Sequence, residues 1–529
     1  MYKKTSLVRG AIILIFAGFL NRILGFIYRI FFVRTVGPEG VGLFEMIFPF
    51  YTLVLVITTA GVPPAISKLV SEQISLGNYR QAKKIFYVAL SFLIIAGFVF
   101  TILLFLLAPL LVRTAFPDPR VYWCLITLIP AVSIISISSA FRGYFLGLQQ
   151  MLPPALGQII EQTVRVFSGI YLAKKFLFYG IEFGVAGLAA GNVLGELIGL
   201  IFLMFMYSCV KKPLLKQGND IKGKGAKINT FVILKKIFSF SIPVTLTRLA
   251  NSILAALQAI LIPQRLQAAG YTFRQATELY GQFSGIALVL LGIPSIITFS
   301  LGTTLVPAIS EAGARKDYRL MQDRCYKAIQ TTLITGLPAT LLFFLFPVQL
   351  CSITFDTPQA GKLLQVMALG SIFLYIAQTS SGILQGLGKV RTYLQNSLLG
   401  AVLNLIGIYY LTSQPTLGIM GTAMSMNIGW ITMALLNMVS IFSYLGISFN
   451  FFKLFIVPAF GISVMGAATY TAYTLFWYLS SNYIFAVMGS ITLGLSIYVI
   501  YLFISGMITK EDMAKFPGIG SFFNGLLIL

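Results

Sequence analysis

Long runs of residues without a single charge constrain this sequence more than any other feature. Residues 85–112, 279–310 and 328–355 contain no Asp, Glu, Lys or Arg. Each run exceeds the roughly 20 apolar residues that a helix needs to cross the hydrocarbon core of a bilayer. A backbone in lipid must satisfy its own hydrogen bonds, so such runs form helices or a closed barrel. A barrel would show short alternating strands, and we therefore predict an all-α integral membrane protein.

The composition agrees with a lipid-facing exterior and argues against an enzyme. Of the 529 residues, 57% are hydrophobic and only 10% are charged, whereas soluble domains carry about 25% charge. The sequence has no histidine, which excludes histidine-based catalysis and metal ligation. Its four cysteines are far apart and form no Cys-x-x-Cys pair, so we expect neither a disulfide framework nor a zinc site. No enzymatic activity, metal or organic cofactor is expected.

Apolar runs and their polar boundaries predict about 14 transmembrane helices. Two charge-free stretches hold two helices each, and polar residues at 412–415 and 480–482 divide them. The first apolar stretch continues to Val33 without a cleavage pattern, so we interpret it as a retained helix. The predicted helices span residues 7–33, 41–64, 85–112, 121–147, 153–173, 184–210, 231–262, 281–308, 325–346, 361–386, 392–411, 417–445, 454–478 and 483–507.

Basic residues in the connecting segments predict the orientation. With the N-terminus in the cytoplasm, 25 of the 38 lysines and arginines fall in inside segments. This excess predicts a multi-pass protein of the cell membrane with both termini in the cytoplasm. It also accounts for the net charge of +23, so no nucleic-acid partner is expected. Eight basic residues fall in outside segments, namely Arg34, Arg113, Arg120, Lys174, Lys175, Arg265, Arg274 and Lys362.

Two sequence echoes predict that the chain consists of related halves. Pro-Ala-Ile-Ser occurs at 64–67 and again at 307–310, and a Gly-x-x-x-Gly-Leu segment at 143–148 recurs at 382–387. The two offsets are nearly equal, which predicts two six-helix lobes related by a parallel repeat, although chance similarity of Gly- and Leu-rich helix ends is the alternative. The predicted divisions are an N-lobe with its polar linker at 1–225, a C-lobe at 226–450, and two further helices with a cytoplasmic tail at 451–529.

A few charges fall inside the predicted helices, where each costs a few kcal/mol or more and needs a partner or a cavity. An interior with more arginines than acids favours an anionic substrate, because guanidinium pairs well with phosphate. The acids all lie in the first half, so we expect any coupling to H+ or Na+ there. The candidate headgroup-binding residues are Arg22, Arg29, Arg142, Arg165 and Arg248, and the candidate coupling acids are Glu45, Glu161 and Glu196.

Each of these charges also has a structural interpretation. Glu161 and Arg165 are four residues apart, so a salt bridge along one helix is the alternative for this pair. Arg22 and Arg248 lie well inside apolar stretches, which favours a functional role. A position at the membrane interface is the alternative for the three residues nearest to helix ends, which are Glu45, Arg142 and Glu196.

Several segments together resemble the polysaccharide-transport branch of the multidrug/oligosaccharidyl-lipid/polysaccharide exporter superfamily. The resemblance covers most of the chain and rests on residues 21–26, 40–43, 61–72, 142–145, 147–149, 158–162, 305–311 and 418–421. It implies a V-shaped pair of lobes around a central cavity that works by alternating access. It also implies a part in making spore cortex peptidoglycan by moving an undecaprenyl-pyrophosphate-linked saccharide outward through the membrane lipid.

The same resemblance implies roles for particular arginines. Arg22 lies in an Arg-x-x-Gly-Phe motif that is similar to the first-helix motif of the related lipid II flippases, which use cationic residues in their cavity. Arg248 matches a later cavity arginine of those flippases by approximate position. The chain departs from them at Tyr28-Arg29, where they more often have Arg-Asp.

Three functions remain open at the level of sequence. The first is a flippase for a lipid-linked oligosaccharide, a peptidoglycan precursor. The second is a cation-coupled multidrug exporter, against which the excess of intramembrane arginine argues. The third is a non-transporting membrane scaffold whose partners are cell-wall synthases.

Overall fold

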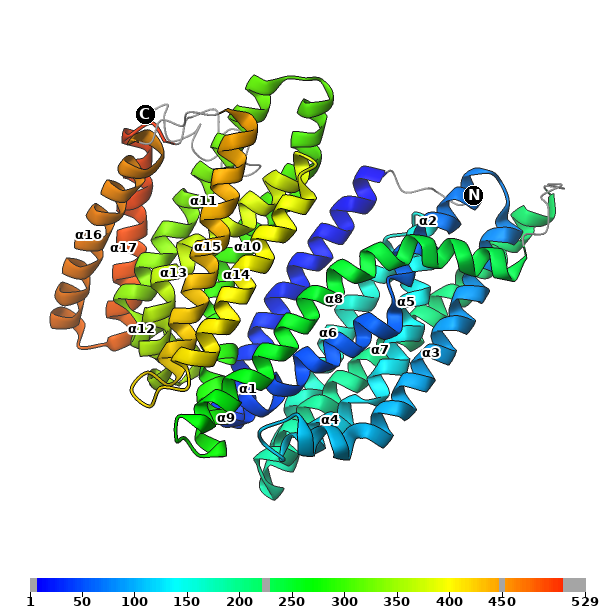
Figure 1. Cartoon of the computed structure of the whole chain (residues 1–529), viewed down its shortest axis with the longest axis horizontal. Helices are drawn as coiled ribbons and strands as arrows, with labels where there is room; N and C mark the ends of the chain where they lie inside the picture. Colours follow the sequence, from blue (N-terminus) through cyan, green and yellow to red (C-terminus); the bar gives the residue numbers. More distant parts are fainter. Residues whose placement is uncertain (1–6, 221–228, 447–451, 508–529) are drawn as a thin grey trace. The chain divides into compact units, whose positions relative to one another are not determined.

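The computed structural model describes residues 7–220, 229–446 and 452–507, and all regular elements in these ranges are helices (Figure 1). The predicted cytoplasmic tail beyond 507 and the centre of the predicted linker, residues 221–228, lie outside the described residues. Packing divides the chain into two compact units, residues 1–285 and 286–529. Each unit is described separately below.

Within residues 7–220 and 229–285, the first unit is built from nine α-helices. A short 3₁₀ turn, Leu177–Tyr179, follows α6, and a π-helical segment, η2, spans Gln282–Ala287 at the end of the unit. The α-helices are α1 (Leu7–Thr59), α2 (Val62–Ser75), α3 (Tyr79–Thr114), α4 (Val121–Leu128), α5 (Pro130–Gly147), α6 (Leu152–Phe176), α7 (Ile181–Asp220), α8 (Thr230–Ala268) and α9 (Phe273–Gly281).

The second unit contains the remaining helices. A 3₁₀ turn at Pro358–Ala360 precedes α13, and a π-helical segment at Phe452–Ile456 leads into α16. The α-helices are α10 (Leu288–Ala314), α11 (Tyr318–Leu345), α12 (Pro347–Phe355), α13 (Gly361–Gly386), α14 (Val390–Leu411), α15 (Ile419–Leu445), α16 (Val457–Ser480) and α17 (Tyr483–Ile504).

The helices account for the predicted number of membrane spans. Twelve described segments are long and apolar enough to cross a membrane, and the first of them, Phe16–Ser75, is 60 residues long. It bends at Gly37, where φ is 69° and ψ is 176°, outside the helical range. Helix α6 falls outside these twelve because Glu161 and Arg165 lower its hydropathy. Counting the bent segment as two and adding α6 gives the fourteen spans expected from the sequence.

The predicted helix 121–147 has the same bounds as the membrane span Val121–Gly147, in which Ile129 separates α4 from α5 just before Pro130, a residue without an N–H. Two other predicted boundaries are wrong. The predicted helix 41–64 ends at Thr59, where Ala60 and Gly61 adopt positive φ angles before α2 begins. Helix α7 continues ten residues beyond its predicted end at 210, into the segment predicted as a linker.

The boundary between the compact units lies later in the chain than the predicted lobe boundary at 225. Helices α8 and α9 pack on α1 and therefore belong to the first unit, although the repeat assigns the corresponding sequence to the C-lobe. Packing and repeat are different criteria, and the division into lobes stays a prediction.

Each unit brings its two sequence echoes together. A Cβ atom at Gly147 on α5 would lie 2.8 Å from the carbonyl oxygen of Ser67 on α2. A Cβ atom at Gly386 on α13 would lie 2.9 Å from Cβ of Ile309 on α10, and the hydroxyl of Ser310 donates to the carbonyl of Gly386 at 2.9 Å. Small residues let helices approach closely in this way. The recurrence of one helix contact in both units supports the predicted repeat.

The apolar cores follow from these contacts. In the first unit the core lies between α2, α3, α5, α7 and α8, with the Phe86 ring 4.5 Å from the Tyr144 ring at its centre. In the second unit it lies mainly between α10, α11, α13 and α15. Helices α16 and α17 pack on each other and on α11 through a smaller cluster around Met465 and Tyr498.

Candidate functional site

Glycines on α7 place its side chains against α6. Gly187, Gly191, Gly195 and Gly199 recur every four residues and so share one face of the helix. A Cβ atom at Gly191 would lie 2.2 Å from the Cα atom of Gly169 on α6. Such a pattern permits close backbone approach between helices. The close contact between α6 and α7 places Glu196, the residue after Gly195, beside the turn of α6 that carries Glu161 and Arg165. We call this turn the charged turn of α6.

The result is an interior ion network of four residues from three helices: Arg142 on α5, Glu161 and Arg165 on α6, and Glu196 on α7. The two carboxylate oxygens of Glu161 each lie 2.6 Å from an arginine, one from Arg165 and the other from Arg142. The carboxylate of Glu196 lies 2.9 Å from Arg165 and 3.6 Å from Arg142. The charges alternate around the network, and their sum is zero.

Burial differs between the two signs of charge in this network. The side chains of Glu161 and Glu196 are each 10% exposed, whereas those of Arg142 and Arg165 are 25% and 23% exposed. The acids therefore lie beneath the arginines. Paired in this way, charges within a membrane span avoid much of the cost of leaving water. The predicted salt bridge between Glu161 and Arg165 is confirmed, and Arg142 and Glu196 join it instead of lying at a helix end.

Arg29 and Glu45 form a separate pair across the bend of α1. Their side chains approach to 2.6 Å, and the guanidinium of Arg29 also donates to the carbonyl of Gly285 at 3.1 Å. This carbonyl belongs to the π-helical segment η2, and such segments often mark functional positions. The hydroxyl of Tyr280 donates to the backbone carbonyl of Glu45 at 3.4 Å. Arg29 thus links α1 to the segment that follows α9.

Arg22 and Arg248 differ from the other three predicted arginines. Both side chains are exposed, Arg22 on α1 and Arg248 on α8, and these two helices pack against each other. The remaining three, Arg29, Arg142 and Arg165, are partly buried and paired with acids. The five candidates therefore do not form one site. They divide into two exposed arginines and three that are committed to ion pairs within the first unit.

Sequence reasoning missed a second ion cluster, which consists of Glu39, Asp118, Arg120 and Thr277. We call it the outer ion cluster because the predicted topology assigns Arg120 to an outside segment. Arg120 was assigned only as an outside loop charge, yet it lies 2.6 Å from Glu39 and 2.8 Å from Asp118. Burial lowers the pKa of Arg120, but hydrogen bonds to Asp118 and Glu39 outweigh this and raise the pKa above its ordinary value. Asp118 and Arg120 are two residues apart, but Glu39 and Thr277 are too far from them in sequence for spacing to reveal the cluster.

The second unit has neutral side chains in the corresponding place. Between α13, α14 and α15, the amide of Asn396 donates to the side-chain oxygen of Asn437 at 3.0 Å, and Asn437 donates to Ser380 at 3.1 Å. All three residues are buried. Sequence reasoning considered only charges inside the membrane and so missed these amides. The two units thus use different chemistry to join equivalent helices.

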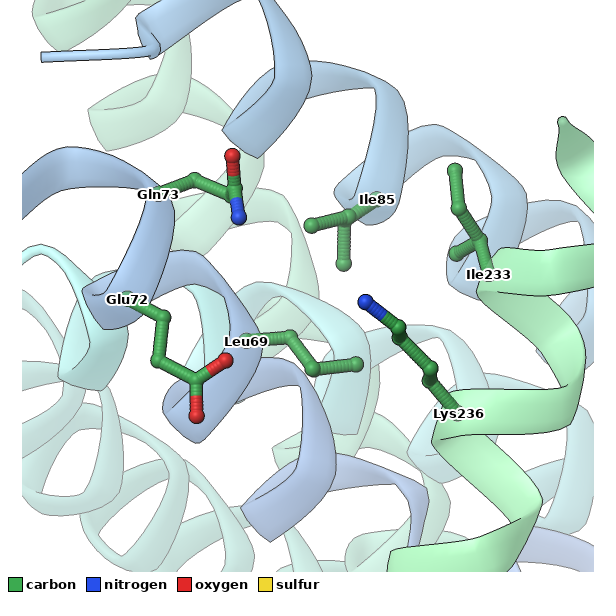
Figure 2. A pocket seen from close by; sticks show the side chains of 6 residues that line it. All are labelled: Leu69, Glu72, Gln73, Ile85, Ile233 and Lys236. Carbon is green, nitrogen blue, oxygen red and sulfur yellow. The ribbon is translucent and has the colours of Figure 1, made fainter. Parts of the chain in front are cut away.

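The pocket in Figure 2 is too small to hold a saccharide headgroup. Its volume is about 20 Å³, room for about one water molecule. The ammonium group of Lys236 on α8 points into it. Among the residues that the structure describes, no group of three or more metal-binding side chains was found. The pocket lies between α2, α3 and α8 and is lined by Leu69, Glu72, Gln73, Ile85, Ile233 and Lys236.

Comparison with known proteins gives consistent matches. The family described as "Polysaccharide biosynthesis protein" matches residues 7–313, and the MatE family matches residues 284–410. Stage V sporulation protein B of Bacillus subtilis (strain 168) is 33% identical over 519 residues, which cover 98% of this chain and 99% of that protein. Lipid II flippase MurJ of the same organism is 25% identical over 465 residues, covering 84% of each chain.

A solved structure shows the same fold. A structure described as lipid II flippase MurJ in an inward closed conformation superposes with a TM-score of 0.68 and covers 93% of this chain and 98% of its own. The two sequences are 18% identical, so this likeness concerns the fold. The expected all-α membrane architecture is confirmed.

Proposed function

The chain belongs to the polysaccharide biosynthesis protein family, and from this premise we propose that it is a flippase for a lipid-linked oligosaccharide. It is a multi-pass membrane protein related to stage V sporulation protein B. Its proposed substrate is an undecaprenyl-pyrophosphate-linked peptidoglycan precursor, moved outward across the cell membrane by alternating access for spore cortex synthesis. The proposed orientation has both termini in the cytoplasm, as the distribution of basic residues indicates.

The main observation in support of this proposal is that the side chains of Arg22 and Arg248 are exposed. Arginines within membrane-spanning helices are costly unless they face a cavity, water or an opposite charge. Both side chains are exposed, and a guanidinium binds a pyrophosphate group through paired, charge-assisted hydrogen bonds. Because α1 and α8 pack together, the two arginines lie on neighbouring helices of one unit. We therefore assign the pyrophosphate headgroup to Arg22 and Arg248.

The other three predicted arginines have a different proposed role. Arg142 and Arg165 hold α5, α6 and α7 together through the interior ion network, and Arg29 holds the bend of α1. They reach a substrate only when their carboxylate partners move away. Coupling of H+ or Na+ through Glu45, Glu161 or Glu196 stays a prediction, and an ion that binds there has to displace an arginine.

The proposal is tested by transport in reconstituted vesicles. Purified protein is placed in liposomes with a fluorescent undecaprenyl-pyrophosphate-linked saccharide, and its appearance in the opposite leaflet is followed by a quencher that does not cross the membrane. Arg22→Gln and Arg248→Gln each remove a charge-assisted contact worth about 1.5–3 kcal/mol, so transport is expected to fall more than about tenfold. Arg315→Gln, on the exposed end of α10, is the matched control and should transport normally.

Retained transport in both the Arg22→Gln and the Arg248→Gln variant would contradict the assigned headgroup site. Two other functions are distinguishable by further outcomes. A non-transporting scaffold predicts that the double variant still supports sporulation. A cation-coupled drug exporter, which the MatE match over residues 284–410 favours, predicts drug efflux that depends on an ion gradient and on the three intramembrane acids.

A further inference from the structure

Positive charge is concentrated in two stretches of the first unit that the predicted topology places at the inner boundary of the membrane. Residues 62–84 and 207–240 contain twelve lysines and arginines but only two acids, Glu72 and Asp220. Eight of the twelve are lysines between positions 211 and 236. Helices α2, α3 and α8, which begin or lie in these stretches, pack on one another within the first unit. The packing therefore brings basic segments that are distant in sequence to one place.

The pocket in Figure 2 lies where these three helices meet. Leu69 of α2, Ile85 of α3 and Ile233 of α8 form its apolar walls, and the ammonium group of Lys236 points into it. Ile85 is the first residue of the predicted span 85–112, and Ile233 lies in the first turn of another predicted span. Leu69 follows the predicted end of a third span by five residues. The pocket is therefore placed at the depth where these spans meet the headgroups of the inner leaflet.

A second ammonium group lies on the same side of α8. The Nζ atom of Lys68 on α2 is 4.7 Å from the centre of the Phe240 ring, and Phe240 is about one helical turn from Lys236. A cation–π contact positions an ammonium group without neutralising its charge. The carboxylate of Glu72 is 4.0 Å from Lys68, but both side chains are about half exposed, so this pair is weak. Lys68 and Lys236 together therefore present positive charge to an anion.

The size and lining of the pocket fit one oxygen atom of a phosphate group. Its volume of about 20 Å³ accommodates one group of the size of a water molecule, which is also the size of a phosphate oxygen. Lysine binds phosphate as a point charge. The rest of a phosphate would lie at the rim, where the side chain of Lys68 is half exposed. The apolar walls and the position at the membrane boundary favour the phosphate of a lipid over a free phosphate ion.

We propose that this pocket binds the headgroup of an anionic phospholipid of the inner leaflet, with one phosphate oxygen held by Lys236 and the rest of the phosphate beside Lys68. The inner leaflet carries the anionic lipids that attract basic segments next to membrane spans. The inference goes beyond the proposed transport function and rests only on the predicted orientation. Because three helices contribute to the site, a bound lipid stabilises the packing of α8 on α2 and α3.

The site is tested by native mass spectrometry of the full-length protein in detergent, titrated with dioleoyl phosphatidylglycerol or dioleoyl phosphatidylcholine. The two lipids have the same acyl chains, and only the first has a net negative charge at neutral pH. The dissociation constant of the first bound lipid is compared for the parent, Lys236→Gln and Lys236→Arg. Lys235→Gln is the matched control, because it removes the same charge at the adjacent exposed position, which does not line the pocket.

We expect the parent to bind phosphatidylglycerol about tenfold more tightly than phosphatidylcholine, and Lys236→Gln to lose about this factor, which corresponds to about 1.4 kcal/mol. Lys236→Arg should retain the affinity because it keeps the charge. Lys235→Gln should weaken binding by less than about threefold, because a charge outside the pocket acts through water. Lys68→Gln, which leaves the pocket lining intact, should have an intermediate effect. Phosphatidylglycerol should also raise the Tm of the parent more than that of Lys236→Gln, and unfolding without it shows that each variant is folded.

Equal losses with Lys236→Gln and Lys235→Gln would overturn the site, because the lipid would then respond to general positive charge. Equal affinity of the parent for the two lipids would also overturn it. Displacement of phosphatidylglycerol by millimolar inorganic phosphate would contradict the assignment to a lipid headgroup. These measurements involve neither transport nor a lipid-linked saccharide, so their failure is distinguishable from failure of the vesicle assay with Arg22 and Arg248.

Discussion

Replacing Glu161 by glutamine should destabilise the first unit, because this residue holds two arginines at once. Each of its carboxylate oxygens lies 2.6 Å from a different guanidinium, and its side chain is 10% exposed. Glu161→Gln leaves two buried guanidiniums facing the single carboxylate of Glu196. Removing one partner of a buried pair costs about 3–5 kcal/mol. The arginines are about one-quarter exposed, so we expect the lower end, about 3 kcal/mol.

Thermal unfolding in detergent, followed by intrinsic fluorescence, measures this loss. For a unit of this size, about 3 kcal/mol corresponds to a fall in Tm of roughly 6 °C or more. Glu311→Gln is the matched control, because its partner Arg315 lies 2.8 Å away, close to the 2.6 Å of the Glu161 contacts, but both side chains are more than half exposed. Exposed pairs contribute about 0–1 kcal/mol, so the control should shift Tm by no more than about 2 °C.

A double variant tests whether the four residues act as a unit. Glu161→Gln with Arg142→Gln removes one charge of each sign and leaves Arg165 and Glu196 paired at 2.9 Å. Residues within one network show interaction energies of about 0.5–3 kcal/mol, so the double variant should be more stable than the sum of the single losses predicts. Additive losses, or a Glu161→Gln shift no larger than that of Glu311→Gln, would refute the network.

Two further changes probe packing and neutral hydrogen bonds, both by thermal unfolding. Gly42→Ala should destabilise the protein by about 3 kcal/mol or more, because its Cβ atom would lie 1.9 Å from the carbonyl oxygen of Thr277. Gly18→Ala is the control, because the space around Gly18 is open, and it should be neutral or stabilising. Equal effects of the two changes on Tm would count against the close packing at Gly42. Asn437→Ala should cost about 1–3 kcal/mol, because it removes the hydrogen bonds of Asn437 to Asn396 and Ser380 and leaves Asn396 only its 3.3 Å contact with Ser440; an unchanged Tm would show that the amides contribute nothing.

Much of the helix pattern is readable from the sequence because charges and turns mark the ends of apolar runs. Helix α13 was predicted at 361–386 and is observed over the same residues. The charge-free stretch 392–452 divides where predicted, between Leu411 and Ile419. The short helices α9 and α12 were missed. Helix α9 is too short and too polar to stand out as a span, whereas α12 lies inside the charge-free run 328–355, where hydropathy does not separate it from α11.

The candidate site was readable only where its residues are local in sequence. The pair of Glu161 and Arg165 follows from helical spacing. Glu196 joins it because glycines on α7 permit close packing against α6, and Arg142 joins it from α5, both through tertiary packing. Arg120 and Glu39 are 81 residues apart, and nothing in their spacing indicates that they meet. Charge composition thus predicts which residues need partners, while the packing of helices decides which partners they find.

The charged turn of α6 has a consequence for how the chain enters the membrane. On insertion scales, an Arg or acidic residue at the centre of a helix costs about 2.5–3.5 kcal/mol, so α6 with Glu161 and Arg165 is a poor substrate for a translocon on its own. Its neighbours supply the missing countercharges, Arg142 from α5 and Glu196 from α7. We therefore expect α6 to insert stably only after α7 has emerged, so a nascent chain that stops after α6 should leave this segment outside the bilayer. On this view the ion network makes three helices one unit of membrane insertion.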